Sequence, residues 1–227
     1  MKNCKIVCLA KWIQFTAQIE QAIVSKKNLN AVIGELKESL SQLTSFDFLA
    51  VEEKHRKIVE FKVKAMILDH IHFIEVVEEL IKANINSVSD WSWQKQLRFY
   101  IRNDEVVIAK MCHSEFEYSY EYQGNFTKLV HTNLTDKCYM TLMIAMLHGY
   151  GGNPFGPAAT GKTESVKSLG ALLGRQVIVF NCDEGLDVHS MGRIFVGIVK
   201  SASWACFDEF NRASCNDAEF LHSLTFI

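Results

Sequence analysis

The sequence comprises 227 residues, of which 48% are hydrophobic and 22% are charged, and its formal net charge is −2. This length accommodates one large domain or two smaller ones with a buried core. The balanced charge offers no electrostatic attraction for nucleic acid, and no apolar run reaches the ~20 residues that span a bilayer, so we expect neither nucleic acid as a partner nor membrane insertion.

The beginning of the chain, "MKNCKIVCLAKW", lacks the long apolar run and small-residue cleavage site of a signal peptide, so we expect an intracellular protein. The seven cysteines are odd in number and widely scattered, without a C-x-x-C pair. We therefore expect reduced thiols rather than disulfides or a metal framework. The eight histidines also fail to cluster along the sequence, and no set of metal-binding histidines is predicted.

Glycine and proline are concentrated in the second half of the chain. Eleven of the twelve glycines lie at or after Gly124, and both prolines fall in the same half. A stretch that almost lacks both breakers is built mainly from long regular elements. We therefore expect a boundary near residues 123–127, with one domain over residues 1–125 and another over 126–227.

Two long helical patterns occupy the first half of the chain. Residues 12–43 carry apolar side chains at steps of three and four, which predicts one apolar stripe along a helix. Residues 51–83 are apolar around much of the helix circumference, which predicts a helix that packs on more than one side. These patterns suit an interaction or lever module and a packed helical bundle equally well.

Between residues 97 and 123 the pattern changes to a period of two. The stretch "LRFYIRNDEVVIAK" predicts two strands joined at Asn103 and Asp104. In "EFEYSYEYQG" (115–124), aromatic residues alternate with mostly acidic ones, which predicts a half-buried strand whose aromatic side chains pack in a core. The intervening acids would repel a nucleic acid backbone, so core packing is favoured over base stacking.

Residues 156–163, "GPAATGKT", satisfy the phosphate-binding pattern G-x-x-x-x-G-K-[ST]. Glycines permit the tight turn in which main-chain N–H groups surround phosphates. We expect Lys162 to contact the β- and γ-phosphates of ATP and the Thr163 hydroxyl to bind Mg²⁺. The following stretch, "KTESVKSLGALLG", predicts the required helix, ending at Gly174.

Two short apolar runs follow this helix. "QVIVFN" (176–181) is typical of a buried parallel strand, and "WACFDEF" (204–210) is a second strand that ends in two acids. An acid at the carboxyl end of such a strand faces the phosphate site of an α/β sheet. We expect Asp208 to hold Mg²⁺ and Glu209 to polarise the attacking water. The chain is thus predicted to have an α/β P-loop fold, although the glycine-rich "HGYGGNPF" before the loop predicts a loop rather than a strand.

The stretches "LTDKCY" (134–139), "GGNPFGPAATGKTESVKSLGALLGRQVIVFNCDEGLDV" and "MGRIFVGIVKSASWACFDEFNR" resemble the first AAA+ module of dynein heavy chains. The residues of these stretches are most similar to those of the cytoplasmic dynein 2 branch of that family. "WSWQKQLRFY" (91–100) resembles the end of the linker that precedes this module. The resemblance implies a truncated AAA+ sheet with flanking helices, preceded by an α-helical and small β linker region.

The resemblance also implies a set of site residues. Glu209 and Lys162 would be catalytic, Thr163 and Asp208 would bind Mg²⁺, and Leu134 and Thr135 would wrap the adenine. Residues implied to bind ATP are Leu134, Thr135, Gly156, Pro157, Ala158, Ala159, Thr160, Gly161, Lys162, Thr163 and Glu164.

Three departures from the family pattern affect these expectations. Asn133 stands where the family usually has proline, and Ala159 replaces a usual loop glycine. If position 159 needs a positive φ, alanine costs roughly 1 kcal/mol. After Arg212, "ASCNDAEFLHSLTFI" leaves the family pattern, so we expect a fragment or an incomplete gene product.

The resemblance implies an ATP-driven, minus-end-directed microtubule motor for retrograde intraflagellar transport, in the cytoplasm, cytoskeleton and cilium or axoneme. Implied partners are the remaining AAA+ modules of the ring, intermediate and light intermediate chains, and microtubules bound through a stalk. Because the family's arginine finger comes from the next module, we expect these 227 residues alone to bind ATP with little turnover. The alternatives are a non-catalytic nucleotide-binding or scaffolding piece and an AAA+ ATPase unrelated to motility.

Overall fold

The structure, a computed structural model, describes residues 4–26, 28–103, 105–123, 128–157, 159–182 and 187–210. The chain forms two compact units. The first comprises Met1–Glu117 and Asn125–Met140, and the second comprises Tyr118–Gly124 and Thr141–Ile227. These units do not coincide with the predicted domains 1–125 and 126–227, which were defined by resemblance and composition rather than by compactness. The domain division at residue 125 therefore stays a prediction.

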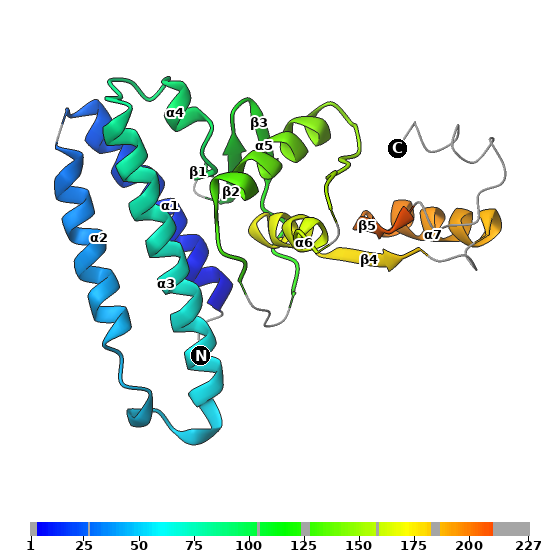
Figure 1. The fold of residues 1–227 in the computed structure, drawn as a ribbon, viewed down its shortest axis with the longest axis horizontal. Coiled ribbons are helices and arrows are strands. Elements are labelled where there is room, and N and C mark those ends of the chain that lie inside the picture. The colour runs from blue at the N-terminus through cyan, green and yellow to red at the C-terminus, as the bar shows by residue number, and fades with distance from the viewer. Residues whose placement is uncertain are drawn as a thin grey trace. The chain divides into compact units, whose positions relative to one another are not determined.

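The first unit contains three long helices, α1 (Cys4–Val24), α2 (Leu29–Thr44) and α3 (Glu53–Lys82), of which α2 and α3 lie side by side (Figure 1). A single helix over residues 12–43 was the wrong prediction, because the chain turns between α1 and α2. Lys26 has a left-handed φ of 51°, and Asn28 accepts a hydrogen bond from the N–H of Asn30 to begin the next helix. The helix predicted over residues 51–83 is confirmed.

A short 3-10 helix, η1 (Phe48–Ala50), lies between α2 and α3. After α3, a short helix, α4 (Trp91–Gln94), leads into a three-stranded antiparallel sheet. Its strands in order are β1 (Arg98–Arg102), β2 (Val106–Met111) and β3 (Ser114–Glu117). The predicted hairpin is confirmed, with Asn103 at a φ of 52° in the turn. Asparagine tolerates this left-handed conformation better than most residues.

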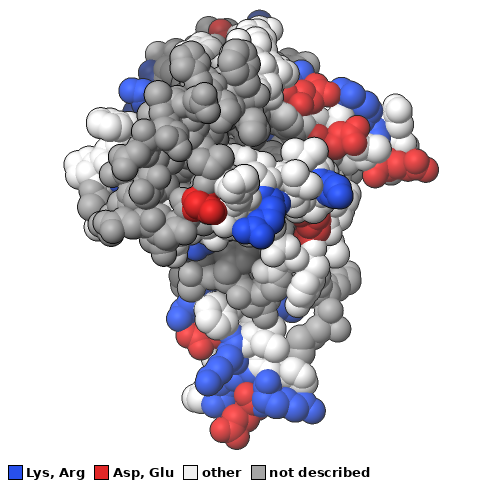
Figure 2. All heavy atoms as spheres, turned by 90° about the vertical axis from the view of Figure 1, so that its right-hand side faces the viewer, with Lys and Arg blue, Asp and Glu red and all other residues white. Residues whose placement is uncertain are grey.

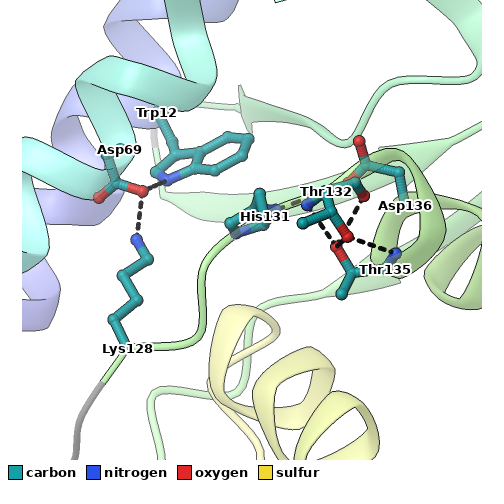
Figure 3. A network of polar contacts seen from close by, with 7 residues as sticks. All are labelled: Trp12, Asp69, Lys128, His131, Thr132, Thr135 and Asp136. Atoms are coloured by element: carbon teal, nitrogen blue, oxygen red, sulfur yellow. Dashed lines mark hydrogen bonds and ion pairs between the residues drawn. The ribbon is translucent and has the colours of Figure 1, made fainter. Parts of the chain in front are cut away.

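The core of the first unit is aromatic and encloses a buried carboxylate. Trp12 packs edge-to-face on Phe73, and Phe15 stacks on the same ring. Beside them Asp69, only 1% exposed, accepts a hydrogen bond of 2.9 Å from Trp12 Nε1 and forms an ion pair with Lys128 (Figure 3). A buried charge requires such partners, so this carboxylate joins α1, α3 and the segment that begins at Lys128.

The second unit is an α/β arrangement. Helix α5 (Asn133–Leu147) begins in the first unit and ends in the second, where it is followed by α6 (Lys162–Leu172), β4 (Val177–Asn181), α7 (Val188–Ser201) and β5 (Trp204–Asp208). Strands β4 and β5 pair in parallel (Figure 1), as parallel strands joined by a helix do. The predicted helix after the loop and both predicted strands are confirmed, and the described residues 150–157 form no strand, as their composition predicts.

The predicted strand over residues 115–124 is wrong beyond residue 117. Within the second unit, the main-chain N–H groups of Ser119 and Glu121 donate to carbonyls at the end of α6 instead of to a neighbouring strand. Tyr120 and Tyr122 are exposed rather than buried. Among the described residues no strand pairs with 118–123, and of the three tyrosines only Tyr118 is buried.

The surface charges and the apolar content of the helices are in line with the balanced charge and moderate hydrophobicity of the sequence. Lysine and arginine are interspersed with aspartate and glutamate among the described residues on the face drawn in Figure 2. Within the described residues, no helix is both long and apolar enough to cross a membrane. Five cysteines in that part of the chain are free: Cys8, Cys112, Cys138, Cys182 and Cys206.

We predict that Trp12→Phe destabilises the protein by about 1–3 kcal/mol, because the buried Asp69 carboxylate loses an N–H donor. The free energy of unfolding would be measured by urea titration with far-UV circular dichroism. Trp91→Phe is the matched control, since this tryptophan is 60% exposed, and its effect should stay within about 0.5 kcal/mol. Equal effects of the two substitutions would contradict the buried network.

Candidate functional site

The predicted phosphate-binding loop lies in the second unit and has an unusual backbone. Gly161 has a φ of 82° and Ala159 a φ of 59°, both in the left-handed region. Thr160 closes the turn by donating its hydroxyl proton to the carbonyl of Pro157, at 2.9 Å. Ala158 lies outside the described residues. Position 159 is thus the place where a glycine would relieve strain, since a left-handed alanine costs about 1–2 kcal/mol.

Lys162 lies over this loop. Its Nζ atom donates to the carbonyls of Gly156 at 2.9 Å and Pro157 at 2.5 Å, so the ammonium group is held at the mouth of the turn. Lys162 is also the first residue of α6, whose N-terminal N–H groups carry partial positive charge. Together these features favour an anion at this position.

Thr163 and Asp208 meet directly, although 45 residues separate them. The Thr163 hydroxyl donates to Asp208 Oδ2 at 2.8 Å. Asp208 reaches this position because it ends β5, in register with Asn181 at the end of β4, so both strands present their carboxyl ends to the same edge. The structure therefore brings together the two residues predicted to bind a metal.

The chemistry of this pair fits Mg²⁺. A carboxylate and a hydroxyl are hard oxygen ligands of the kind that Mg²⁺ prefers, alongside water and phosphate oxygens. Both lie beside the loop and the N-terminus of α6, where phosphates would bind. The residues present thus fit a nucleotide with its magnesium ion.

Glu209, the predicted base, follows Asp208 in a strained conformation. Its φ is 50°, and its main-chain N–H donates to Asp208 Oδ1 at 3.0 Å. Strained non-glycine residues persist where surrounding structure determines them, and they cluster at functional sites. This hydrogen bond helps to fix the Asp208 carboxylate. Glu164, also predicted to bind ATP, pairs with Lys167 at 2.6 Å on the exposed side of α6.

Leu134 and Thr135, predicted to wrap adenine, belong to the first unit. Thr132 and Thr135 form a reciprocal capping box at the start of α5, in which each hydroxyl accepts the main-chain N–H of the other residue, at 3.3 and 2.8 Å. Asn133 is the first helical residue, the position at which proline is favoured. The capping box secures this helix start without proline, and Leu134 is exposed. Contact with adenine stays a prediction.

One group of possible metal ligands was not identified from the sequence. The rings of His72 and His131 lie 4.4 Å apart in the first unit, and Asp136 lies next to them. The histidines do not cluster along the sequence, but the fold brings these two together. Fifty-nine residues separate the two histidines, one on a helix and the other in a loop, so no local spacing could have revealed their proximity.

Comparison with known proteins agrees with this geometry. Residues 118–219 match the protein family described as the hydrolytic ATP binding site of dynein motor region. The matched range includes the predicted loop, Glu209, and the pair Thr163 and Asp208 that the structure brings into contact.

Curated relatives extend the similarity over most of the chain. It is 55% identical over 210 residues to cytoplasmic dynein 2 heavy chain 1 of Homo sapiens and 56% identical over 211 residues to that of Tripneustes gratilla, each covering 92% of this chain and 5% of the relative. The protein of the same name from Chlamydomonas reinhardtii is 49% identical over 205 residues, 90% of this chain and 5% of the relative. The chain thus spans about a twentieth of the length of the relatives it matches. From these matches, the chain belongs to the dynein heavy chain family.

Proposed function

We propose that this chain provides the ATP-binding segment of a dynein motor, at the junction of the linker and the first AAA+ module. The observation that carries this proposal is the 2.8 Å contact between Thr163 and Asp208, made beside a loop that holds the Lys162 ammonium group. A hydroxyl, a carboxylate and an ammonium gathered at one helix N-terminus suit a triphosphate with Mg²⁺ far better than they suit structural packing.

Each residue of the site has a role that its position supports. Lys162 neutralises charge on the β- and γ-phosphates, and the loop N–H groups orient them. Thr163 and Asp208 hold the magnesium ion, and Glu209 orients and polarises a water molecule. Leu134 and Thr135 contact the adenine. When bound, Mg-ATP supplies the phosphoanhydride bond whose hydrolysis drives the motor.

The wider roles follow from the family relationship. We propose that ATP hydrolysis at this segment drives linker movement in a minus-end-directed microtubule motor, within a ring completed by further AAA+ modules. The names of the relatives support a cytoplasmic dynein 2 role, with retrograde intraflagellar transport in cilia and intermediate and light intermediate chains as partners. An arginine finger from a neighbouring module would add about 10³–10⁵ in rate, so the 227-residue polypeptide should turn over ATP slowly.

A non-catalytic nucleotide-binding or scaffolding role is the second candidate. It is favoured by the partial burial of the pair β4 and β5, whose residues are intermediate or exposed. A sheet that is not fully covered holds the acidic pair less rigidly, and catalysis requires accurate positioning. Turnover measurements separate this candidate from the first.

Lys162→Ala should weaken ATP binding on the order of 100-fold, because a charge-assisted contact with the phosphates is lost. Isothermal titration calorimetry with Mg-ATP measures this directly. Lys167→Ala is the control, since this lysine lies on the same helix but pairs with Glu164 in solvent, and it should bind within about threefold of the parent chain. Unchanged affinity in Lys162→Ala would overturn the site assignment.

Glu209→Gln should retain ATP binding but lose turnover, because glutamine cannot accept the proton of the attacking water. Single-turnover hydrolysis of labelled ATP, with the protein in excess, detects even slow cleavage. Glu117→Gln, an exposed substitution in the first unit, should leave the rate unchanged. Binding without detectable cleavage in the parent chain would favour the non-catalytic role, and cleavage that survives in Glu209→Gln would exclude Glu209 as the base.

Ala159→Gly should stabilise the second unit by up to about 1 kcal/mol, since glycine adopts a left-handed φ without a Cβ clash. Ala202→Gly is the matched control: Ala202 has a φ of 51° at the end of α7, and glycine should stabilise that helix end similarly. Only Ala159→Gly should also tighten ATP binding, by up to about tenfold. Tighter binding in both variants, or in neither, would contradict a specific role for loop strain.

A further inference from the structure

Three side chains from separate parts of the first unit converge away from the ATP-binding loop. His72 lies on α3, His131 lies just before α5, and Asp136 lies in the first turn of α5. One ligand atom from each lies within 4.8 Å of the other two. Among the residues that the structure describes, no other group of three or more histidine, cysteine, aspartate or glutamate side chains meets this criterion.

His131 is buried without satisfying its ring nitrogens. The residue is 6% exposed, and neither Nδ1 nor Nε2 has a hydrogen-bond partner. Nδ1 lies 3.6 Å from Asp136 Oδ1, which is too long for a hydrogen bond. Leaving a buried polar group unpaired is costly, so such a group in a folded protein calls for an explanation.

The surrounding structure holds the three side chains in place. The capping box of Thr132 and Thr135 lies between His131 and Asp136 along the chain and fixes the helix start that carries both (Figure 3). The rings of Trp12 and Tyr139 lie 5.8 and 5.7 Å from that of His131 and form an apolar wall. The Asp136 side chain is 25% exposed, which leaves a path from solvent.

The charges in and around the group suit a cation. His72, like His131, is buried at 6% exposed, so both imidazoles face the site rather than solvent. The nearby Lys128 ammonium is paired with Asp69. The group therefore offers two imidazoles and a single carboxylate.

We propose that His72, His131 and Asp136 form a binding site for a divalent transition metal, with zinc as the preferred ion. Two imidazole nitrogens and a carboxylate oxygen are a recurrent zinc ligand set, with a fourth position left for water. Tetrahedral ligands at about 2.0–2.1 Å from zinc lie roughly 3.4 Å apart, so binding requires the ligand atoms, now within 4.8 Å of one another, to approach by up to about 1.4 Å. Imidazole ligands disfavour Mg²⁺ and Ca²⁺.

The bound ion would join α3 to the start of α5. Asp136 directly follows Leu134 and Thr135, so the metal would also restrain the segment proposed to contact adenine. The site lies wholly within the first unit and uses none of the phosphate-binding residues, so its existence does not depend on the proposed ATPase function.

The test uses the full 227-residue chain, freed of metal by a chelator and titrated with Co²⁺ and then Zn²⁺. We expect one equivalent of Co²⁺ to bind with visible d–d absorption, displaced by Zn²⁺ with a Kd at or below about 1 µM. Thiolate charge-transfer bands should be absent, because none of the ligands is a cysteine. No saturable binding in this range, or a thiolate spectrum, would overturn the proposal.

Variants assign the binding to the three residues. His131→Phe keeps the ring volume and Asp136→Asn keeps the side-chain shape, and each should weaken Zn²⁺ binding by more than about 100-fold, since even outer partners of metal ligands contribute 10–100-fold. His70→Phe is the matched control: His70 is equally buried on α3 but bonds to the carbonyl of Met66. Far-UV circular dichroism identifies a misfolded variant, and Asp136→Asn then carries the test. Wild-type affinity in folded Asp136→Asn would refute the site.

Discussion

The hydrogen bond between Thr163 and Asp208 depends on the parallel pairing of β4 and β5. Because side chains alternate along a strand, a slip of one residue in β5 would turn Asp208 to the opposite face of the sheet. The observed register aligns it with Asn181, at the end of the strand that follows α6. Every role proposed for the site requires this register, since the loop supplies cationic and N–H groups but no acid.

Two residues of the candidate site have a strained backbone. Ala159 and Glu209 both have left-handed φ values of 59° and 50°, one in the loop and the other directly after the acidic strand. Each costs free energy that the surrounding contacts must offset. The hydroxyl bond of Thr160 supports the loop, and the bond from the Glu209 N–H to the Asp208 carboxylate supports the turn. The strained positions flank the place where phosphates and water are proposed to meet.

The first unit uses polar groups inside an aromatic core to join distant parts of the chain. Asp69 connects Trp12 of α1 with Lys128, and His72 of α3 meets His131 three residues beyond that lysine. Apolar packing alone tolerates small shifts, whereas a buried charge with a fixed donor does not. These contacts hold the segment that leads into α5, and hence the capping box that begins this helix.

Local patterns were sufficient for the loop, the helix α6, the strands β4 and β5, the hairpin of β1 and β2, and α3, because each depends on residues close in sequence. The family resemblance pointed to Ala159 as a position where alanine would be strained if φ were positive, and its φ is 59°. The same reasoning failed where the chain did not form the element that its local pattern predicted. A turn with a left-handed Lys26 divides the predicted helix over residues 12–43, and within the part of the chain that the structure describes no strand pairs with the aromatic alternation after residue 117.

The sequence by itself determined that this protein has a phosphate-binding motif, an acidic strand end and a dynein-like pattern, because these are properties of spacing and composition. Only the tertiary structure decided that Thr163 touches Asp208, that Asp69 is buried against Trp12 and Lys128, and that His72 lies against His131. The physical reason is that such contacts join residues 45 or more positions apart, and strand register and core packing, rather than any local preference, bring them within bonding distance.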